Sequence, residues 1–135
     1  MNCPFCDIVS EKLTCHKIYE DEHTLAILDI ADDVDGHILV IPKAHVESIL
    51  DCDSFTLNRV MQSVQTVSRH LLSCGYDGVN VLNASGTAAD QSIPHLHFHL
   101  IPRRRGDGLN TWPLLPGATE SRNVLCEKLT MCKKE

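Results

Sequence analysis

The sequence has no long hydrophobic run and lacks the features that would direct the chain to a membrane or divide it into parts. No stretch of its 135 residues approaches the ~18 apolar residues of a membrane-spanning helix. Residues 1–7 contain neither the basic nor the apolar segment of a secretory signal peptide. Internal repeats, low-complexity tracts and Gly/Ser-rich linkers are also missing. We therefore expect one cytoplasmic domain over residues 1–135 that binds no membrane.

Basic side chains are scarce. The chain has 12 Lys and Arg against 18 Asp and Glu, a formal charge of −6 with the eight His counted as neutral. Its only basic cluster is the run Arg103–Arg105. Because a polyanion would be repelled, we expect no bulk nucleic-acid binding, although a small anion can still be bound locally. The apolar (43%) and charged (22%) fractions are typical of globular proteins, so the chain can bury a core without disulfides.

The seven cysteines are an odd number in a chain without a secretion signal, which indicates reduced thiols or metal ligands. Cys3 and Cys6 form a C-x-x-C pair, whose spacing fits a redox dithiol, half of a zinc site or coincidence. The redox interpretation is weak, because the pair lacks the preceding strand and following helix of a thioredoxin-like unit. The others have no partner at ligand spacing and are interpreted as ordinary core or surface residues: Cys15, Cys52, Cys74, Cys126 and Cys132.

Short β-rich segments separated by turn signals recur along the chain. We expect two extended pieces around an acidic turn within residues 19–29. Further strands are expected at 37–41, 79–82 and 95–101, the first and last of these ending at Pro42 and Pro102.

One long helix is predicted at about residues 55–73. Asp53 or Ser54 suits its N-cap, and Gly75 lies where a left-handed residue ends a helix. Apolar residues recur at steps of three and four and form one stripe: Leu57, Val60, Met61, Val64, Val67 and Leu71. A short helical turn is expected at 44–50. Because turns rather than crossover helices join the strands, we predict an α+β fold with an antiparallel sheet and a helix on one face.

Three histidines alternate within residues 94–102. In a strand, side chains two residues apart share a face, so His95, His97 and His99 are predicted on one face and apolar residues on the other. The apolar face can pack against the stripe of the long helix. Thr, Lys or Glu would be typical of a solvent-exposed face, so three aligned imidazoles indicate a reactive surface.

This segment resembles the signature of the histidine-triad (HIT) family, His-x-His-x-His followed by two apolar residues, here residues 95–101. Phe5, Asp29 and the runs 36–45 and 86–92 also resemble family segments in the family's order. The resemblance covers about residues 3–105 and leaves 106–135 as a tail. It implies a HIT-like sheet of about five strands with one long and one short helix on one face.

The resemblance further implies an enzyme that acts on phosphoramidate or phosphoric anhydride bonds at the α-phosphorus of a purine nucleotide or dinucleoside polyphosphate. It assigns nucleophilic attack to His97, whose other ring nitrogen should donate to a backbone carbonyl. His99 should donate to a non-bridging or leaving-group oxygen. Gln91 and Ser92 are expected to hold the phosphate chain through neutral donors, and no catalytic metal is predicted.

On the nucleoside side, the resemblance implies that Asp29 accepts hydrogen bonds from both ribose hydroxyls. The base would lie against an apolar wall: Phe5, Ile8, Ile27 and Ile30. Asn83 resembles the family's phosphate-side asparagine, although the loop from Asn83 to Gln91 is one residue longer than in the members compared. Asp90 stands where Gly is usual, so its carboxylate either points away from a polyphosphate or narrows the substrate range by repulsion.

The resemblance also places His45 and His95 at two ligand positions of the family's zinc-binding branch. With Cys3 and Cys6 they would form a closed Cys2His2 site, structural rather than catalytic. Such a site would attach the N-terminal segment to the start of the catalytic strand. His37 either orients the active-site histidines or is an ordinary strand histidine.

Family members are typically symmetric dimers, so we expect a homodimer whose tail reaches the partner's site, with Trp112 as a contact residue. Two other functions stay open. A nucleotidyltransferase usually has Gln in place of the third histidine, so His99 favours water as the acceptor. A zinc-stabilised nucleotide-binding regulatory module with little turnover would use the same pocket.

Overall fold

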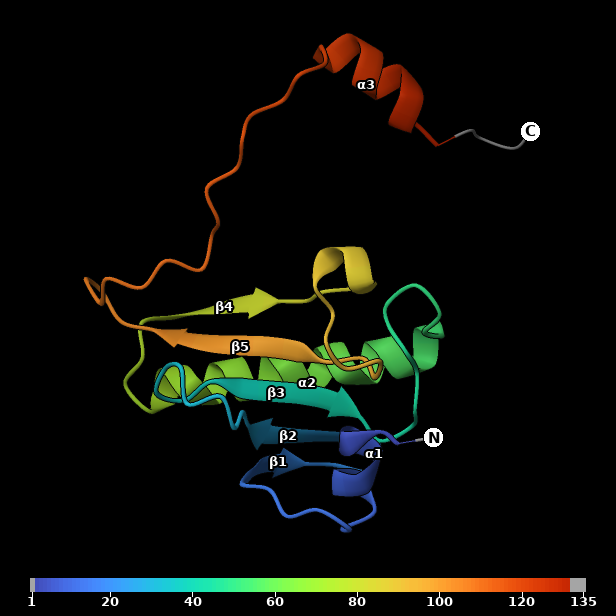
Figure 1. Ribbon diagram of the computed structural model, residues 1–135. Helices are drawn as coiled ribbons and strands as arrows, with labels where there is room; N and C mark the ends of the chain where they lie inside the picture. The colour runs from blue at the N-terminus through green and yellow to red at the C-terminus, as the bar shows by residue number, and fades with distance from the viewer. Residues whose placement is uncertain (1, 132–135) are drawn as a thin grey trace.

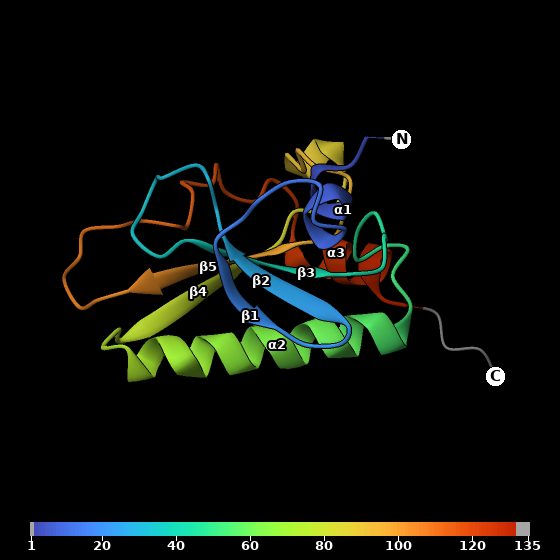
Figure 2. The same ribbon diagram turned by 90° about the horizontal axis from the view of Figure 1, so that it is seen from below.

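The computed structural model describes residues 2–131, which build a five-stranded antiparallel sheet with helices on both faces (Figures 1 and 2). The sheet order is β1-β2-β3-β5-β4, and the predicted α+β class is confirmed. In chain order the elements are α1 (Pro4–Val9), β1 (Lys17–Glu20), β2 (Thr24–Leu28), β3 (Ile38–Pro42), α2 (Ser54–Ser73), β4 (Gly78–Leu82), a 3-10 turn η1 (Thr87–Ala89), β5 (Phe98–Arg103) and α3 (Arg122–Leu129). Within residues 2–131, no helix combines the length and apolarity that crossing a bilayer requires.

The long helix α2 lies along one face of the sheet (Figure 2). Asp53 is its N-cap and accepts a hydrogen bond from the Thr56 N–H at 2.8 Å. Gly75 follows the helix with φ 100°, the left-handed conformation that was predicted. Met61 departs from the predicted stripe with 37% exposure, whereas Ser63 is only 1% exposed. The helix and the sheet enclose the larger apolar core: Ala26, Ile38, Val40, Val60, Val64, Val67, Leu71, Leu96, Phe98 and Leu100.

The opposite face of the sheet carries the short helix α1 and a second apolar core. This core consists of Cys3, Phe5, Leu25, Ile27, Leu39 and Ile41. Cys3 is the N-cap of α1, and Pro4 occupies the first turn, where its missing N–H removes no hydrogen bond. The two cores use alternate residues of β2 and β3, as the two-residue period of a strand requires. Both faces of the sheet are therefore covered.

The prediction of a short helix on the same face as the long one is wrong in two respects. Residues 44–50 contain no helix, because the Asp51 carboxylate accepts hydrogen bonds from the N–H groups of Glu47 (3.2 Å) and Ser48 (2.8 Å) and closes a turn there. The short helix that does form, α1, lies on the face opposite to α2. Its six residues are too few to show a hydrophobic period.

β3 ends at Pro42, as predicted, whereas β5 runs through Pro102, which was expected to end it. Pro42 pairs with Thr24, and Pro102 pairs with Val79 on β4. Pairing between β3 and β5 extends only to Leu100, so Pro102, which has no N–H, lies beyond it. The last strand consequently covers residues 98–103 rather than 95–101.

A polar network anchors the β1–β2 turn to α2. The Asp21 carboxylate accepts hydrogen bonds from the His23 N–H (2.9 Å), the Thr24 N–H (2.8 Å), and the hydroxyls of Tyr19 (3.1 Å) and Ser63 (3.1 Å). Burial alone would raise the pKa of Asp21, but the hydrogen bonds outweigh it and lower the pKa to about 2. The ionised carboxylate therefore stabilises the fold.

Replacing Asp21 with Asn should make stability less sensitive to acid. The folded-state pKa lies below the unfolded value, so the contribution is present above about pH 4 and disappears as the pH falls through about 2. We expect Asp21→Asn to lower the free energy of unfolding at neutral pH by about 2 kcal/mol. Between about pH 4 and pH 2, the free energy of unfolding of the variant should fall less steeply than that of the wild type. Urea denaturation over a pH series, with the exposed Glu22→Gln as control, measures this; parallel Asp21→Asn and wild-type curves would contradict it.

The chain leaves the sheet after β5 and ends in α3, which lies apart from the sheet in Figure 1. Apolar side chains of this tail are exposed: Trp112 at 72%, Leu114 at 100% and Leu115 at 62%. No residue of α3 is buried. The predicted homodimer, in which a partner would meet this tail, stays a prediction. Cys132 lies outside the described residues.

Candidate functional site

The three alternating histidines lie on the α1 side of the sheet. Leu96 and Phe98 point into the core beneath α2, and the Phe5 ring meets those of His95 and His97 edge-on at 5.7 and 5.2 Å between centroids. The predicted alternation is confirmed. Only His99, however, belongs to β5, because His95 and His97 precede the strand. His95 and His97 are also more buried than the prediction of a reactive surface implied, because their exposed fractions are only 0% and 5%.

The His97 ring is oriented by its own backbone segment. Its Nδ1 donates a hydrogen bond to the His95 carbonyl at 2.7 Å, so the Nε2 atom carries the lone pair. Within residues 2–131, Nε2 has no hydrogen-bond partner and is not among the fully buried unpaired atoms. The Asn83 amide donates to the His97 carbonyl at 3.0 Å and fixes the backbone from the β4 side. The sequence-based expectation of a carbonyl-bound ring nitrogen therefore matches this geometry.

A chain of hydrogen bonds runs from His99 to a carboxylate. His37 Nε2 lies 2.9 Å from His99 Nδ1, and His37 Nδ1 donates to Asp33 Oδ1 at 2.8 Å. Burial lowers the pKa of His99, and the neighbouring His97 and His37 add to the shift. These contacts favour the orienting interpretation of His37. The composition of residues 32–36 is typical of a turn, but the role of Asp33 was not predicted, because no local pattern indicates that its carboxylate returns to a residue four positions later.

The loop before β3 depends on one glycine. Gly36 has φ 81°, and a Cβ at this position would lie 3.1 Å from Pro102 Cγ and 3.3 Å from the Tyr76 hydroxyl. Any residue other than glycine would therefore be strained at this position, both by the positive φ and by the short contacts of its Cβ. Gly36 therefore allows a tight turn between Asp33 and β3, and this turn places His37 against β5.

Four donor atoms from distant parts of the chain converge beside the triad. One atom each of Cys3, Cys6, His45 and His95 lies within 4.8 Å of the others, and we call these residues the Cys2His2 cluster. Cys6 Sγ lies 3.2 Å from His45 Nδ1, Cys3 Sγ lies 3.4 Å from His95 Nδ1, and the two Nδ1 atoms are 3.2 Å apart. A tetrahedral zinc ion separates such donors by about 3.3–3.8 Å. The set therefore fits zinc.

The surroundings of the Cys2His2 cluster also suit a cation. His95 Nε2 donates to the Pro42 carbonyl at 2.8 Å, which leaves the Nδ1 lone pair directed at the cluster. Burial raises the pKa of the Cys6 thiol. The hydrogen bond to Cys3 and the negative charge of a Cys3 thiolate raise it further. A bound cation would reverse that shift and hold both thiolates.

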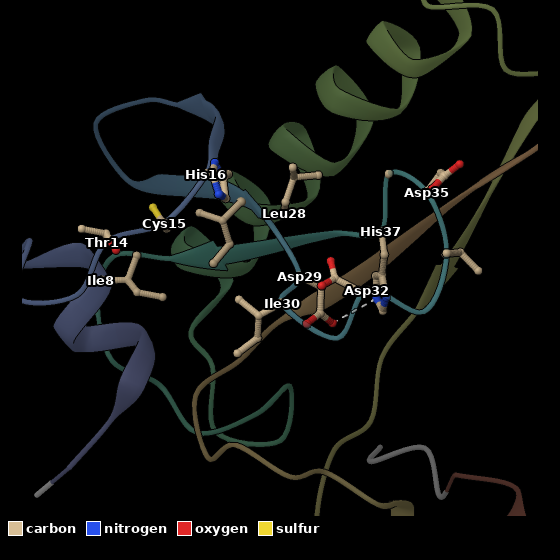
Figure 3. Close-up of a pocket in the computed structure, with 13 residues that line it drawn as sticks. Ile8, Thr14, Cys15, His16, Leu28, Asp29, Ile30, Asp32, Asp35 and His37 are labelled. Atoms are coloured by element: carbon tan, nitrogen blue, oxygen red, sulfur yellow. Dashed lines mark ion pairs between the residues drawn. The ribbon is translucent and has the colours of Figure 1, made fainter.

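A cavity of about 500 Å³ opens beside His37 on the α1 side of the sheet (Figure 3), and its lining includes none of the three triad histidines. It is lined by three of the residues predicted for base contact, Ile8, Ile27 and Ile30, and by Asp29. Figure 3 shows the Asp29 carboxylate facing His37, and their Oδ2 and Nε2 atoms are 3.4 Å apart. Phe5 does not line this cavity, since it is 4% exposed and packs on the triad. Cys15, interpreted above as an ordinary residue, also lines it, together with His16.

A second cavity of about 440 Å³ lies on the other side of His37. His37 and His99 line it together with two acidic residues, Asp33 and Asp90. Asp90 is therefore among the residues that line this cavity. His37 lines both cavities, so both reach the hydrogen-bond chain that supports His99.

The predicted phosphate loop is arranged differently from expectation at Gln91. Its amide nitrogen donates to the carbonyls of Glu47 (2.7 Å) and Ile93 (2.9 Å), and its oxygen accepts from the Gly86 N–H at 2.8 Å. These bonds occupy the Gln91 amide, so in this structure it braces the loop instead of offering a free donor. Ser92 is exposed, and its role in binding phosphate stays a prediction.

Comparison with known proteins identifies the family. The family model described as "HIT domain" matches residues 10–106. The chain belongs to the HIT domain family. A Zn-bound HIT protein from Mycobacterium smegmatis, solved by crystallography, superposes with a TM-score of 0.78 at 40% identity, covering 82% of this chain and 81% of that one. Together with the donor geometry of the Cys2His2 cluster, this relative suggests zinc in the present HIT protein.

Two HIT relatives carry names that state an activity. The adenosine 5'-monophosphoramidase hnt1 of Schizosaccharomyces pombe is 35% identical over 132 residues, covering 96% of this chain and 97% of that protein. The adenylylsulfatase HINT3 of Arabidopsis thaliana is 36% identical over 109 residues, covering 80% of this chain and 55% of that protein. The HIT proteins related to this chain thus include named hydrolases.

Proposed function

We propose that this HIT protein hydrolyses nucleoside phosphoramidates through a covalent nucleotidyl-histidine formed on His97. The observation that carries the proposal is the 2.7 Å hydrogen bond from His97 Nδ1 to the His95 carbonyl, which leaves the Nε2 lone pair free for attack. Relatives named adenosine 5'-monophosphoramidase and adenylylsulfatase support an adenylyl substrate.

The reaction has two displacement steps at the α-phosphorus. In the first, His97 Nε2 forms a bond to phosphorus while the bond to the leaving nitrogen breaks, and that nitrogen takes up a proton from solvent and departs as ammonia or an amine. In the second, a water oxygen bonds to phosphorus and the bond to His97 breaks. The water protons go to the released nucleotide and to solvent, and His97 returns to its neutral form. Splitting the displacement in this way replaces one difficult step by two easier ones.

The two cavities provide opposite ends of the substrate site. Asp29, which is only 16% exposed and lies in the first cavity, would accept the ribose hydroxyls, with Ile8, Ile27 and Ile30 beside the base. His99 lines the second cavity, where its Nε2–H would donate a hydrogen bond to the phosphate or leaving group as charge develops, while its Nδ1 accepts a hydrogen bond from the Nε2–H of His37. The contact with His37 holds the His99 ring for that task.

The acidic lining of the second cavity favours a small leaving group. Asp33 and Asp90 both contribute to it, and their carboxylates would repel the additional phosphates of a dinucleoside polyphosphate. An amine leaving group adds no negative charge. We therefore propose phosphoramidates as the preferred substrates.

The Cys2His2 cluster is proposed to have a structural role. Zinc bound there has four protein donors and no open position, so it would supply no catalysis. It would attach α1, and with it Phe5 and Ile8, to the segment that begins the triad.

A substrate panel tests the proposed specificity. Adenosine 5'-phosphoramidate should be hydrolysed with a kcat/KM at least about tenfold above those of diadenosine tri- and tetraphosphate, a difference of about 1.4 kcal/mol in transition-state binding. Removing one repulsive charge with Asp90→Asn should narrow this ratio by raising kcat/KM for the tetraphosphate. Glu22→Gln serves as a control that removes an exposed charge far from the cavity. Equal use of both classes by the wild type, or an unchanged ratio in Asp90→Asn, would reject the specificity argument.

A further inference from the structure

A second group of potential metal ligands lies outside the Cys2His2 cluster. One donor atom each of Asp29, His37 and His99 lies within 4.8 Å of the others. His37 Nε2 is the central atom, 2.9 Å from His99 Nδ1 and 3.4 Å from Asp29 Oδ2. The strand order explains the convergence. Asp29 follows β2, His37 precedes β3 and His99 lies on β5, and β3 is the strand between the other two.

The spacing and orientation of these atoms suit a metal ion. Adjacent ligands at bond lengths of about 2.0–2.2 Å are separated by about 2.8–3.6 Å, which covers the 2.9 and 3.4 Å distances measured from His37 Nε2. Asp33 accepts a hydrogen bond from His37 Nδ1 at 2.8 Å, so a neutral His37 directs its Nε2 lone pair into the group. A histidine that binds a metal usually donates a hydrogen bond from its other ring nitrogen to a carboxylate or carbonyl in this way.

The position of the group leaves room for further ligands. Asp29 lines the first cavity, His99 lines the second, and His37 lines both. The side chains of His37 and Asp29 are 8% and 16% exposed, so an ion would be largely shielded yet reachable from either cavity. This arrangement differs from the Cys2His2 cluster, in which four protein donors surround the centre.

We propose that Asp29, His37 and His99 form a second metal site, which binds a divalent first-row transition ion such as Zn²⁺ or Co²⁺. Two imidazoles and one carboxylate prefer these ions to Mg²⁺ or Ca²⁺, which take oxygen ligands. The ion replaces the proton shared between His37 and His99. Because the proposed function assigns Asp29 to the ribose and His99 to the leaving group, the ion and the nucleotide exclude one another. This last point rests on the proposed function, whereas binding of the ion does not.

Metal titration of the nucleotide-free protein tests the site directly. Protein that already holds one zinc per chain is titrated with Co²⁺, and bound metal is measured by equilibrium dialysis while the visible spectrum is recorded. We expect a second ion per chain whose spectrum shows cobalt d–d bands without thiolate-to-cobalt charge transfer. A total of one ion, or charge-transfer bands from the added cobalt, overturns the proposal.

Variants locate the ion. Asp29→Asn and His37→Ala should each weaken the second ion at least about tenfold and leave the first ion in place. The matched control is His23→Ala, which removes a histidine 3.7 Å from a surface carboxylate, Glu22, outside the group. A second ion that is weakened by His23→Ala but not by the two site variants overturns the assignment.

Competition with a nucleotide separates this proposal from the proposed function. Excess AMP should displace the second ion from the wild type and leave the first ion bound. If the second ion binds, responds to the site variants and is not displaced by AMP, the metal site stands and the assignment of Asp29 to the ribose is wrong.

Discussion

Replacing His97 should remove both turnover and the covalent intermediate. We expect His97→Ala to lower kcat for adenosine 5'-phosphoramidate by at least about 1,000-fold, because no other ring nitrogen occupies its place. Intact-mass measurement after incubation with substrate should show an AMP adduct on the wild type that is acid-labile. The same measurement on His97→Ala should show none.

Two further variants make this result interpretable. His97 is 5% exposed, so an alanine leaves a hole in a packed region, and His97→Gln offers a side chain that fills more of it without a nucleophilic ring. His70→Ala, at the far end of α2, controls for loss of any histidine. An adduct or turnover that survives in folded His97→Ala and His97→Gln rejects His97 as the nucleophile. Nucleotide binding by the wild type without an adduct instead supports a regulatory binding module.

Loss of zinc from the Cys2His2 cluster should have the largest effect on stability. Cys3 is 4% exposed, and its thiol meets His95 across 92 positions of the sequence. Because these ligands come together only in the folded chain, the free energy of zinc binding adds directly to the free energy of unfolding. We expect Cys3→Ser to eliminate the tightly bound zinc and to lower Tm by about 10 °C. Residual turnover should persist, because the ion is not in the reaction path.

The control for this experiment is Cys74→Ser, which changes an exposed cysteine at the end of α2. Zinc content by mass spectrometry and thermal unfolding by circular dichroism should match the wild type in this variant. Wild-type protein stripped of metal by a chelator should unfold at the lower temperature of Cys3→Ser. Metal-free protein with an unchanged Tm would contradict a structural role for zinc.

The parts of the fold that follow local patterns were predictable from the sequence. The stripe of α2 and the cap at Asp53 depend on spacing within a few residues, and the structure confirms the cap and the stripe apart from Met61. The extent of β5 depends instead on its neighbours. Pro102 is accommodated because pairing with β3 has already ended at Leu100, which no local pattern reveals.

The candidate site was likewise predictable only where it follows local patterns or the family resemblance. The alternation of the histidines predicted that His97 and His99 lie together, and the family resemblance predicted the Cys2His2 cluster; the structure brings both sets of residues together. Asp33 and the bracing role of Gln91 were not predictable, because both depend on where a loop closes in space. Acidic and amide side chains are common in loops, and their partners here include backbone atoms that carry no sequence signal.

The distance in sequence between α1 and β5 determines when the site can exist during synthesis. Cys3 and Cys6 leave the ribosome first, whereas His95 emerges only after four of the five strands have been made. A nascent chain therefore exposes two thiols without their complete pair of histidine ligands until nearly the whole sheet is available. A truncated chain that ends before His95 retains both cysteines but lacks one of the four ligands, so oxidants and stray metal ions can reach the thiols.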